Sequence, residues 1–244
     1  MRCPEALLTA PVAVPALVLL ILFFAGSSLG AQILQVPADY PTIQEAIDAA
    51  QGGDTVLVAP GTYFENIDFL GKAITVTSIL GPEATTVDGG GSGSVASFVN
   101  GEGQDSLLSG FTITHGRSFS NVGGGGGIRC LFSAPTIEDC RVTDNISDEG
   151  AGLRIAGFHP NPLVIRNCTF TGNHSFVNGG AARLDFVEAE IEDCVFAGNT
   201  ALRRGGGLYL QGGPVTFLRC DIANNTGHYW GGGLYVWDGN VTLE

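Results

Sequence analysis

The chain has 244 residues and a formal net charge of −13, with 37 glycines and only one lysine beside ten arginines. This length suits one large domain, and the acidic balance argues against a nucleic-acid-binding protein, which would need a basic face. Frequent glycine without a collagen period, together with an apolar fraction of 44%, is typical of many tight turns between short strands around a core rather than of a disordered chain.

Residues 1–31 have the pattern of an export signal. Arg2 precedes an apolar run over residues 12–25, and small residues follow it up to residue 31, where a signal peptidase could cut. Two prolines and the short span favour a cleaved signal over a retained membrane anchor. Because no second apolar span of ~20 residues follows, we expect a secreted or cell-surface protein with no membrane span in the mature chain.

The segment after the signal predicts a helical cap. Thr42 and Glu45 have the spacing of a capping box, and Ile43 and Ile47 place apolar side chains on one helical face. A short α-helix of this kind can cover the open end of a stack of strands, whose edges would otherwise pair with another chain. Residues 32–107 are therefore expected to hold this cap and the first coils of the fold.

From residue 108 onward the sequence repeats itself. Four segments share a cysteine that is followed five residues later by an asparagine. The cysteines are 28, 26 and 26 residues apart, at Cys140, Cys168, Cys194 and Cys220. The asparagines are Asn145, Asn173, Asn199 and Asn225. Self-similarity at a fixed spacing is the signature of a repeat architecture.

A glycine-rich motif keeps the same spacing. It reads GGGLYL at residues 205–210 and GGGLYV at 231–236, and earlier copies end at residues 130, 155 and 184. In every copy the two residues that flank the outward one are apolar, for example Leu208 and Leu210 on either side of Tyr209, which predicts a strand with one buried face. A unit of this length with two or three short strands and glycine-rich corners predicts an all-β fold, a single-stranded parallel β-helix whose coils stack ~4.8 Å apart.

The repeats also resemble known families. F-T-G-N at 170–173 with G-G-A-A at 179–182 is similar to the repeats of chlamydial polymorphic outer-membrane proteins, and the segment 36–66 is similar to the entry segment of many secreted β-helix proteins. After the signal, the chain looks like a right-handed parallel β-helix of the pectate-lyase-like superfamily. In enzymes of that superfamily, the resemblance implies a substrate that lies along an outer strand face. Fold resemblance specifies architecture and not chemistry.

The C-terminal residues predict a truncated solenoid. Residues 240–244 align with 214–218, so the sequence stops within a strand, two residues before the next cysteine position. A solenoid normally needs an atypical terminal repeat. We therefore expect residues 108–244 to be regular coils that belong to a longer protein.

Stacked coils would place equivalent residues in columns inside the fold. The asparagines are expected to form a ladder of amide hydrogen bonds. The cysteines are expected to be small apolar fillers, because parallel side chains in register rarely reach the torsion of a disulfide. No Cys-x-x-Cys pair and no cluster of histidines indicates a metal site, so we expect no metal and no other cofactor.

The outward residues of the glycine-motif strands form a predicted ligand-binding stripe. Arginine forks bind carboxylates or sulfates and aromatic rings offer flat stacking surfaces, so the stripe suits an acidic polysaccharide or a cell-surface glycan. The same residues are also ordinary for a solvated strand face, and the sequence favours the two interpretations about equally. Alanine at Arg154, Arg183 and Tyr235 is expected to weaken binding and to leave thermal stability nearly unchanged. The candidate residues are Arg129, Arg154, Arg183, Tyr209 and Tyr235, with Trp237 two residues further along the face and Tyr229 and Trp230 at the preceding corner.

No catalytic set can be identified in the sequence. The stripe has Asp185 as its only acid, so it lacks the oxygen ligands of a calcium-dependent lyase and the paired carboxylates of a glycoside hydrolase. G-T-Y-F-E-N at 61–66 matches the first motif of pectin methylesterases, but the segment with their catalytic aspartate is missing. Two functions stay open: a non-catalytic β-helix that binds polysaccharide or acts as an adhesin-like scaffold, and a polysaccharide lyase or glycoside hydrolase whose catalytic coils lie beyond Glu244.

Overall fold

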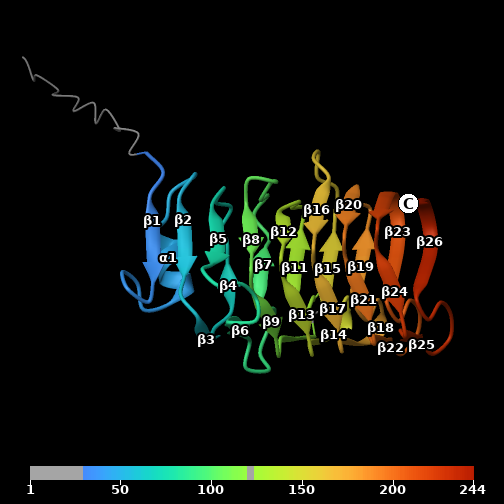
Figure 1. The fold of residues 1–244 in the computed structure, drawn as a ribbon. Coiled ribbons are helices and arrows are strands. Elements are labelled where there is room, and N and C mark those ends of the chain that lie inside the picture. The colour runs from blue at the N-terminus through green and yellow to red at the C-terminus, as the bar shows by residue number, and fades with distance from the viewer. Residues whose placement is uncertain (1–29, 120–123) are drawn as a thin grey trace, which may run out of the picture. The chain divides into compact units, whose positions relative to one another are not determined.

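The computed structural model describes residues 30–119 and 124–244. The predicted export signal therefore lies outside the described residues, apart from Gly30 and Ala31. From Ala31 to Glu244 the chain winds as a parallel β-helix, and its coils follow one another in chain order from β1 to β26 (Figure 1). The predicted fold class is confirmed.

Each complete coil contributes one short strand to each of four faces. The first face holds β4 (Ile67–Asp68), β7 (Ala96–Phe98), β11 (Ile128–Leu131), β15 (Leu153–Ala156) and β19 (Ala182–Asp185). The second face holds β1 (Ile33–Val36), β2 (Thr55–Val58), β5 (Thr75–Ser78), β8 (Leu107–Ser109), β12 (Thr136–Glu138), β16 (Leu163–Arg166) and β20 (Ala189–Glu192). The third face holds β3 (Gly61–Phe64), β6 (Thr85–Asp88), β9 (Thr112–Thr114), β13 (Arg141–Thr143), β17 (Thr169–Thr171), β21 (Val195–Ala197) and β24 (Asp221–Ala223). The fourth face holds β10 (Arg117–Ser118), β14 (Ile146–Glu149), β18 (His174–Asn178), β22 (Thr200–Ala201) and β25 (Thr226–Gly227).

Two long strands join the first and second faces. These strands, β23 (Leu208–Leu218) and β26 (Leu234–Leu243), run through the corner without a break, so that both faces belong to one 14-stranded sheet. The third and fourth faces are separate sheets of seven and five strands.

Four strands per coil is more than the two or three predicted from the sequence. The reason lies in the corners, where single residues adopt the left-handed backbone conformation and turn the chain. In one coil these residues are Phe132, Asp139, Asp144 and Gly150, all with φ between 51° and 60°. Asp, Asn and Gly tolerate this conformation best. Four such corners divide this coil into four short strands.

The core consists of columns of equivalent side chains. On the second face, Ile137 pairs in register with Ile165, which pairs with Ile191, which pairs with Phe217, and all four are buried. On the third face, the rings of Phe170 and Phe196 stack with centroids 4.9 Å apart.

The five cysteines of the described residues are free thiols. Cys140, Cys168 and Cys194 are buried one coil apart, Cys220 is partly buried, and each points its sulfur toward a backbone carbonyl of the preceding coil. They occupy the filler position that the sequence predicts.

A ladder of asparagines lies at the corner between the third and fourth faces. The Oδ1 of Asn173, Asn199 and Asn225 each accepts two hydrogen bonds, from the backbone N–H and the side-chain amide of the preceding asparagine, at 2.9–3.1 Å. Each amide also donates to a carbonyl oxygen on the third face of the coil before, for example Asn199 to that of Phe170 at 2.9 Å. The predicted ladder is confirmed, and it satisfies amides that are buried.

The glycine motif is a corner that only glycine fits. Its first residue, Gly205, has a φ of 61°, and an added Cβ would lie well inside van der Waals contact of the carbonyl oxygen of Leu208. Gly198 has a similar φ of 67° but has open space around it. A side chain added at Gly198 therefore meets only backbone strain, whereas one added at Gly205 meets both strain and a steric clash.

We expect Gly205→Ala to lower the free energy of unfolding by more than about 3 kcal/mol, because the side chain adds a clash with the backbone to the left-handed strain. Gly198→Ala is the matched control and is expected to cost only the strain, about 1–2 kcal/mol. Urea unfolding of the two variants measures the difference. Equal losses for both would show that the close approach at Gly205 does not matter.

The predicted helical cap is also present. Helix α1 (Ile43–Ala49) begins at Thr42, whose side chain accepts a hydrogen bond from the backbone N–H of Glu45 at 3.1 Å. Its first two N–H groups are satisfied by the carboxylate of Glu65, at 3.0 and 2.9 Å. A negative charge at this end also complements the helix dipole. The helix buries its apolar face against β1, β2 and β4 at the start of the solenoid (Figure 1).

Candidate functional site

The predicted stripe is a column of paired residues on the first face. Arg129 pairs with Arg154, Arg154 with Arg183, Arg183 with Tyr209, and Tyr209 with Tyr235, one per coil from β11 to β26. The register predicted for these five residues is confirmed.

A second column, of which the sequence analysis identified only the C-terminal corner residues, runs beside the stripe. It consists of the residue directly before each glycine turn, Glu149, Asn178, Arg204 and Trp230, which also stack one per coil. The glycine turn leads from this column to the stripe, and side chains of the two columns meet there, as Glu149 does with Arg183 and Arg204 with Tyr235. The sequence signal was available, because each of these residues immediately precedes a copy of the glycine motif.

The middle of the stripe is an ion-pair network rather than an open surface. The carboxylate of Asp185 accepts from Arg154 Nη2 at 2.6 Å and from Arg183 Nε at 2.9 Å, and Arg183 also forms an ion pair with Glu149. Burial lowers the pKa of the Arg154 guanidinium, and the charge of Asp185 opposes this effect. Acids thus offset the repulsion among neighbouring arginines.

The prediction that the whole stripe is solvent-exposed is therefore wrong for two residues. Arg154 is 5% exposed and Tyr209 is 4% exposed. The side chains of the second column and of neighbouring coils cover them, and burial raises the pKa of the Tyr209 hydroxyl. Because Arg154 is a buried partner of Asp185, alanine at Arg154 is now expected to lower thermal stability rather than to leave it unchanged.

The last two coils present aromatic rings around one arginine. The guanidinium of Arg204 lies over the rings of Trp230, Tyr235 and Trp237, at 4.7, 5.4 and 5.0 Å from their centroids. Tyr235 also stacks on Tyr209 at 5.5 Å. Tyr229, Trp230 and Trp237 are 68%, 56% and 55% exposed. We call Arg203, Arg204, Tyr229, Trp230 and Trp237 the aromatic–arginine surface.

One predicted alignment within this surface is wrong. Trp237 was expected beside Gln211 in the next column of the first face, but Gln211 pairs with Asp238. The register shifts between Leu210 and Gln211, so Trp237 is the extra residue of a bulge. A bulge redirects a side chain, and here the ring of Trp237 reaches Arg204.

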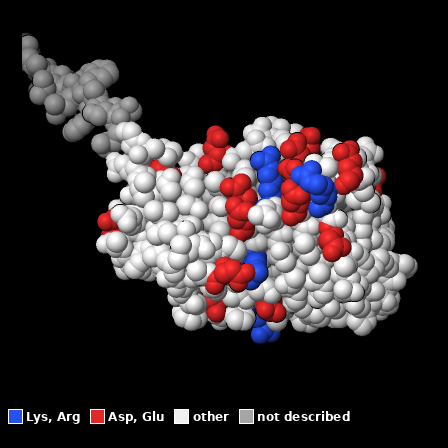
Figure 2. Space-filling model, in the orientation of Figure 1, with Lys and Arg blue, Asp and Glu red and all other residues white. Residues whose placement is uncertain are grey.

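The arginines of this surface differ from most others in their partners. Arg203 and Arg204 form no ion pair within residues 30–119 and 124–244, and Arg203 is exposed. On the face drawn in Figure 2, the basic side chains lie directly beside acidic ones. The ion-paired arginines are Arg141, Arg154, Arg166, Arg183 and Arg219.

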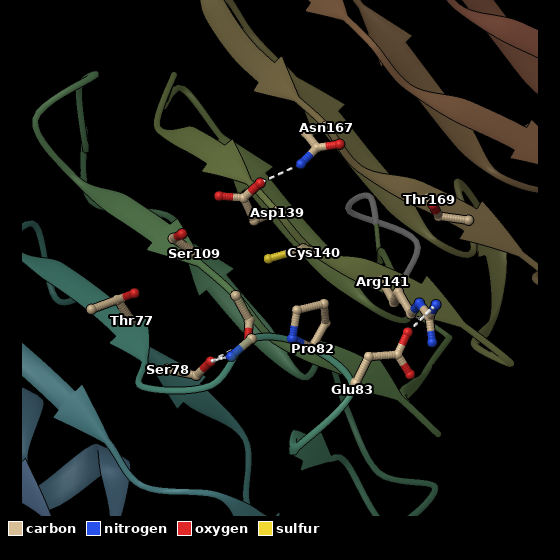
Figure 3. A pocket seen from close by; sticks show the side chains of 12 residues that line it. Thr77, Ser78, Pro82, Glu83, Ser109, Asp139, Cys140, Arg141, Asn167 and Thr169 are labelled. Carbon is tan, nitrogen blue, oxygen red and sulfur yellow. Dashed lines mark hydrogen bonds and ion pairs between the residues drawn. The ribbon is translucent and has the colours of Figure 1, made fainter.

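Two hollows on the described residues are candidates for a ligand. The larger, about 480 Å³, lies between the turn at residues 81–83 and the strands of the third face (Figure 3). Of its charged groups, Arg141 forms an ion pair with Glu83, and Asp139 accepts a hydrogen bond from the amide of Asn167. The smaller, about 320 Å³, is lined by Asn178 and by four residues at the aromatic end of the two columns, Arg203, Arg204, Tyr229 and Trp230. Only the smaller hollow contains arginines without acidic partners.

Neither a metal centre nor a membrane span is found in the part of the chain that the structure describes. Within it, no three His, Cys, Asp or Glu side chains are grouped so that they could hold a metal ion. No described helix has the length and apolar character needed to cross a bilayer.

Comparisons with known proteins agree with the architecture. Residues 193–211 match the family model of the Chlamydia polymorphic membrane protein repeat. The predicted resemblance of the repeats is confirmed. No curated protein sequence matches the chain.

The similar solved structures are pectin methylesterases. One from carrot has 13% identity and a TM-score of 0.49, covering 89% of this chain and 84% of its own. A pectin methylesterase in complex with a hexasaccharide has 12% identity and a TM-score of 0.48, and a mutant in complex with a hexasaccharide has 12% identity and a TM-score of 0.44; each match covers 85% of this chain and 80% of the other.

Proposed function

We propose that the protein is an exported β-helix that binds acidic polysaccharide through the aromatic–arginine surface. The observation that carries the proposal is a pair of arginines, Arg203 and Arg204, that have no acidic partner in the described part of the chain. They lie among exposed rings in a chain with a net charge of −13. Export rests on the signal pattern of residues 1–31. The site of action is then outside the cell or at its surface.

The chemistry of the surface suits a carbohydrate chain with negative charges. Sugar rings present flat C–H faces that pack on aromatic side chains, and the guanidinium of arginine binds a carboxylate or a sulfate with two parallel hydrogen bonds. Arg204, held among Trp230, Tyr235 and Trp237, orients these rings. Pre-oriented rings lose little side-chain entropy when a ligand binds.

The ion-paired half of the stripe has a different role in this proposal. Arg154 and Asp185 are buried partners that hold Arg183 on β19, and the guanidinium of Arg183 lies over the ring of Tyr209 on β23. The ligand contacts assigned to the stripe therefore move to its C-terminal end, Tyr235, Trp237 and the corner residues Tyr229 and Trp230. Arg129, partly buried at the start of the column, is outside the proposed surface.

Retention on immobilised polygalacturonate tests the proposal. We expect Trp230→Ala and Trp237→Ala each to weaken retention about tenfold or more, equivalent to about 1.4 kcal/mol, because each removes a ring that faces solvent. Phe158→Ala is the matched control, since Phe158 is an exposed ring at another corner of the solenoid, and it is expected to bind like the parent chain. All three variants should unfold at the same urea concentration.

Two results would contradict the proposal. Undiminished retention in both tryptophan variants would show that the aromatic–arginine surface does not bind the polysaccharide. Release of unsaturated oligosaccharides from the polymer would show a lyase, which is the alternative function, and would require catalytic groups that this surface does not contain.

A further inference from the structure

The smaller hollow lies at the C-terminal end of the second column. It lies where Asn178, Arg204 and Trp230 stack on successive coils, next to Arg203 and Tyr229. Its volume of about 320 Å³ is at the lower end of the range of small-molecule sites, roughly 300–1,000 Å³. A hollow of this size fits a single sugar residue rather than a longer segment.

The side-chain oxygen of Asn178 is buried and has no hydrogen-bond partner among the described residues. The residue as a whole is 8% exposed. The asparagines of the ladder, by contrast, bond through both amide atoms. Buried polar side chains are almost always satisfied in folded proteins, so an unsatisfied amide in the wall of a hollow indicates a missing partner.

A hydroxyl group has the properties of that partner. Because a hydroxyl both donates and accepts, it bonds either to the oxygen or to the nitrogen of the amide, whichever faces it. The terminal torsion of asparagine is broad, so the amide can turn toward an entering group at little cost. Sugars are rich in such hydroxyls.

The two arginines and two rings define the rest of the ligand. Arg204 is already engaged with three rings, whereas Arg203 is exposed and has no ion-pair partner among the described residues. Arg203 is therefore the group that remains available for a carboxylate. Trp230 and Tyr229 supply apolar ring surface beside it, with centroids 6.1 Å apart.

We propose that this hollow binds one hexuronate residue of the polysaccharide, with a ring hydroxyl on the amide of Asn178, the carboxylate on Arg203, and the apolar sugar face on Trp230. This subsite rests on the proposed function and adds to it a ligand class, because it distinguishes a free uronate from its methyl ester. The ester lacks the charge that a guanidinium needs for a strong paired hydrogen bond.

Isothermal titration with a short oligogalacturonate and with its methyl ester tests this subsite. The parent chain should bind the acid at least tenfold more tightly than the ester. Arg203→Gln, an exposed substitution, should abolish this preference while leaving the affinity for the ester unchanged.

Asn178→Leu should weaken binding of both ligands by about tenfold. Its midpoint of thermal unfolding should stay equal or rise, because the substitution removes no hydrogen bond of the side chain and removes an unsatisfied buried amide.

The outcomes separate this subsite from the general proposal. Equal affinity for acid and ester in the parent chain would overturn the uronate subsite and leave polysaccharide binding intact. Full affinity in Asn178→Leu would overturn the role of the amide. If Arg203→Gln still bound the acid more tightly than the ester, the role of Arg203 would be overturned. Failure of the parent chain to bind either ligand, or binding of a sulfated oligosaccharide only, would overturn the subsite, and failure on every acidic polymer would also end the proposed function.

Discussion

Replacing Asn199 with alanine is expected to lower the free energy of unfolding by about 3–5 kcal/mol. The substitution removes the partner of the buried backbone N–H of Asn173, one of the two acceptors of the Asn173 amide, a donor to the carbonyl of Phe170, and one of the two donors to the Oδ1 of Asn225. Each unsatisfied buried group costs about 1–3 kcal/mol. The ladder links successive coils, so its loss acts on two coil interfaces at once. Urea unfolding with a single transition measures the change.

Asn167→Gly is the control for this prediction. Asn167 is exposed at a corner with a φ of 50°, and its side chain makes one hydrogen bond, to Asp139. Glycine keeps that backbone conformation without strain, so we expect a loss below about 1 kcal/mol. If Asn199→Ala cost no more than this control, the ladder would not contribute to the stability of the coils.

Removing Asp185 is expected to have a comparable effect. Asp185→Ala leaves the guanidinium of Arg154 buried without its carboxylate, and a broken buried pair typically costs about 3–5 kcal/mol. Arg183 keeps an ion-pair partner in Glu149 and its position over the ring of Tyr209, so the loss concentrates on Arg154. The same unfolding measurement applies.

A double variant distinguishes the lost pairing from the lost volume. Arg154→Met combined with Asp185→Leu removes both charges and fills the space with apolar groups, which is often neutral or stabilising for a buried pair. We expect it to be more stable than Asp185→Ala by at least about 2 kcal/mol. A double variant as unstable as the single one would mean that the charges are not the reason for the loss.

The features that repeat could be predicted from the sequence. Columns such as Cys140, Cys168 and Cys194, and the asparagine ladder beside them, follow from spacing alone, because in-register stacking repeats each position once per coil. The alternation in the glycine motif likewise predicted the pairing of Arg154, Arg183 and Tyr209. The chemistry of the capping box predicted α1 from local residues.

The features that depend on contacts across a corner could not be predicted in this way. Period-two alternation says that Arg154 and Tyr209 point away from the core, but it does not say what covers them. The covering side chains come from residues such as Glu149 and Arg204, which precede the glycine turn and belong to no strand of the same face. The bulge at Trp237 interrupts the register that alignment assumes. Tyr229, Trp230 and Trp237 are therefore exposed whereas Arg154 and Tyr209 are buried, and ligand binding by the predicted residues stays a prediction.

The most direct test of the account uses the two tryptophans of the chain, Trp230 and Trp237. Both lie in the aromatic–arginine surface, so intrinsic tryptophan fluorescence reports on that surface alone. Titration with an oligogalacturonate at constant ionic strength should change the emission in a saturable way, and excess neutral glucan should leave it unchanged. An emission spectrum that stays constant while the same oligosaccharide binds by calorimetry would contradict the account, because the ligand would then lie elsewhere.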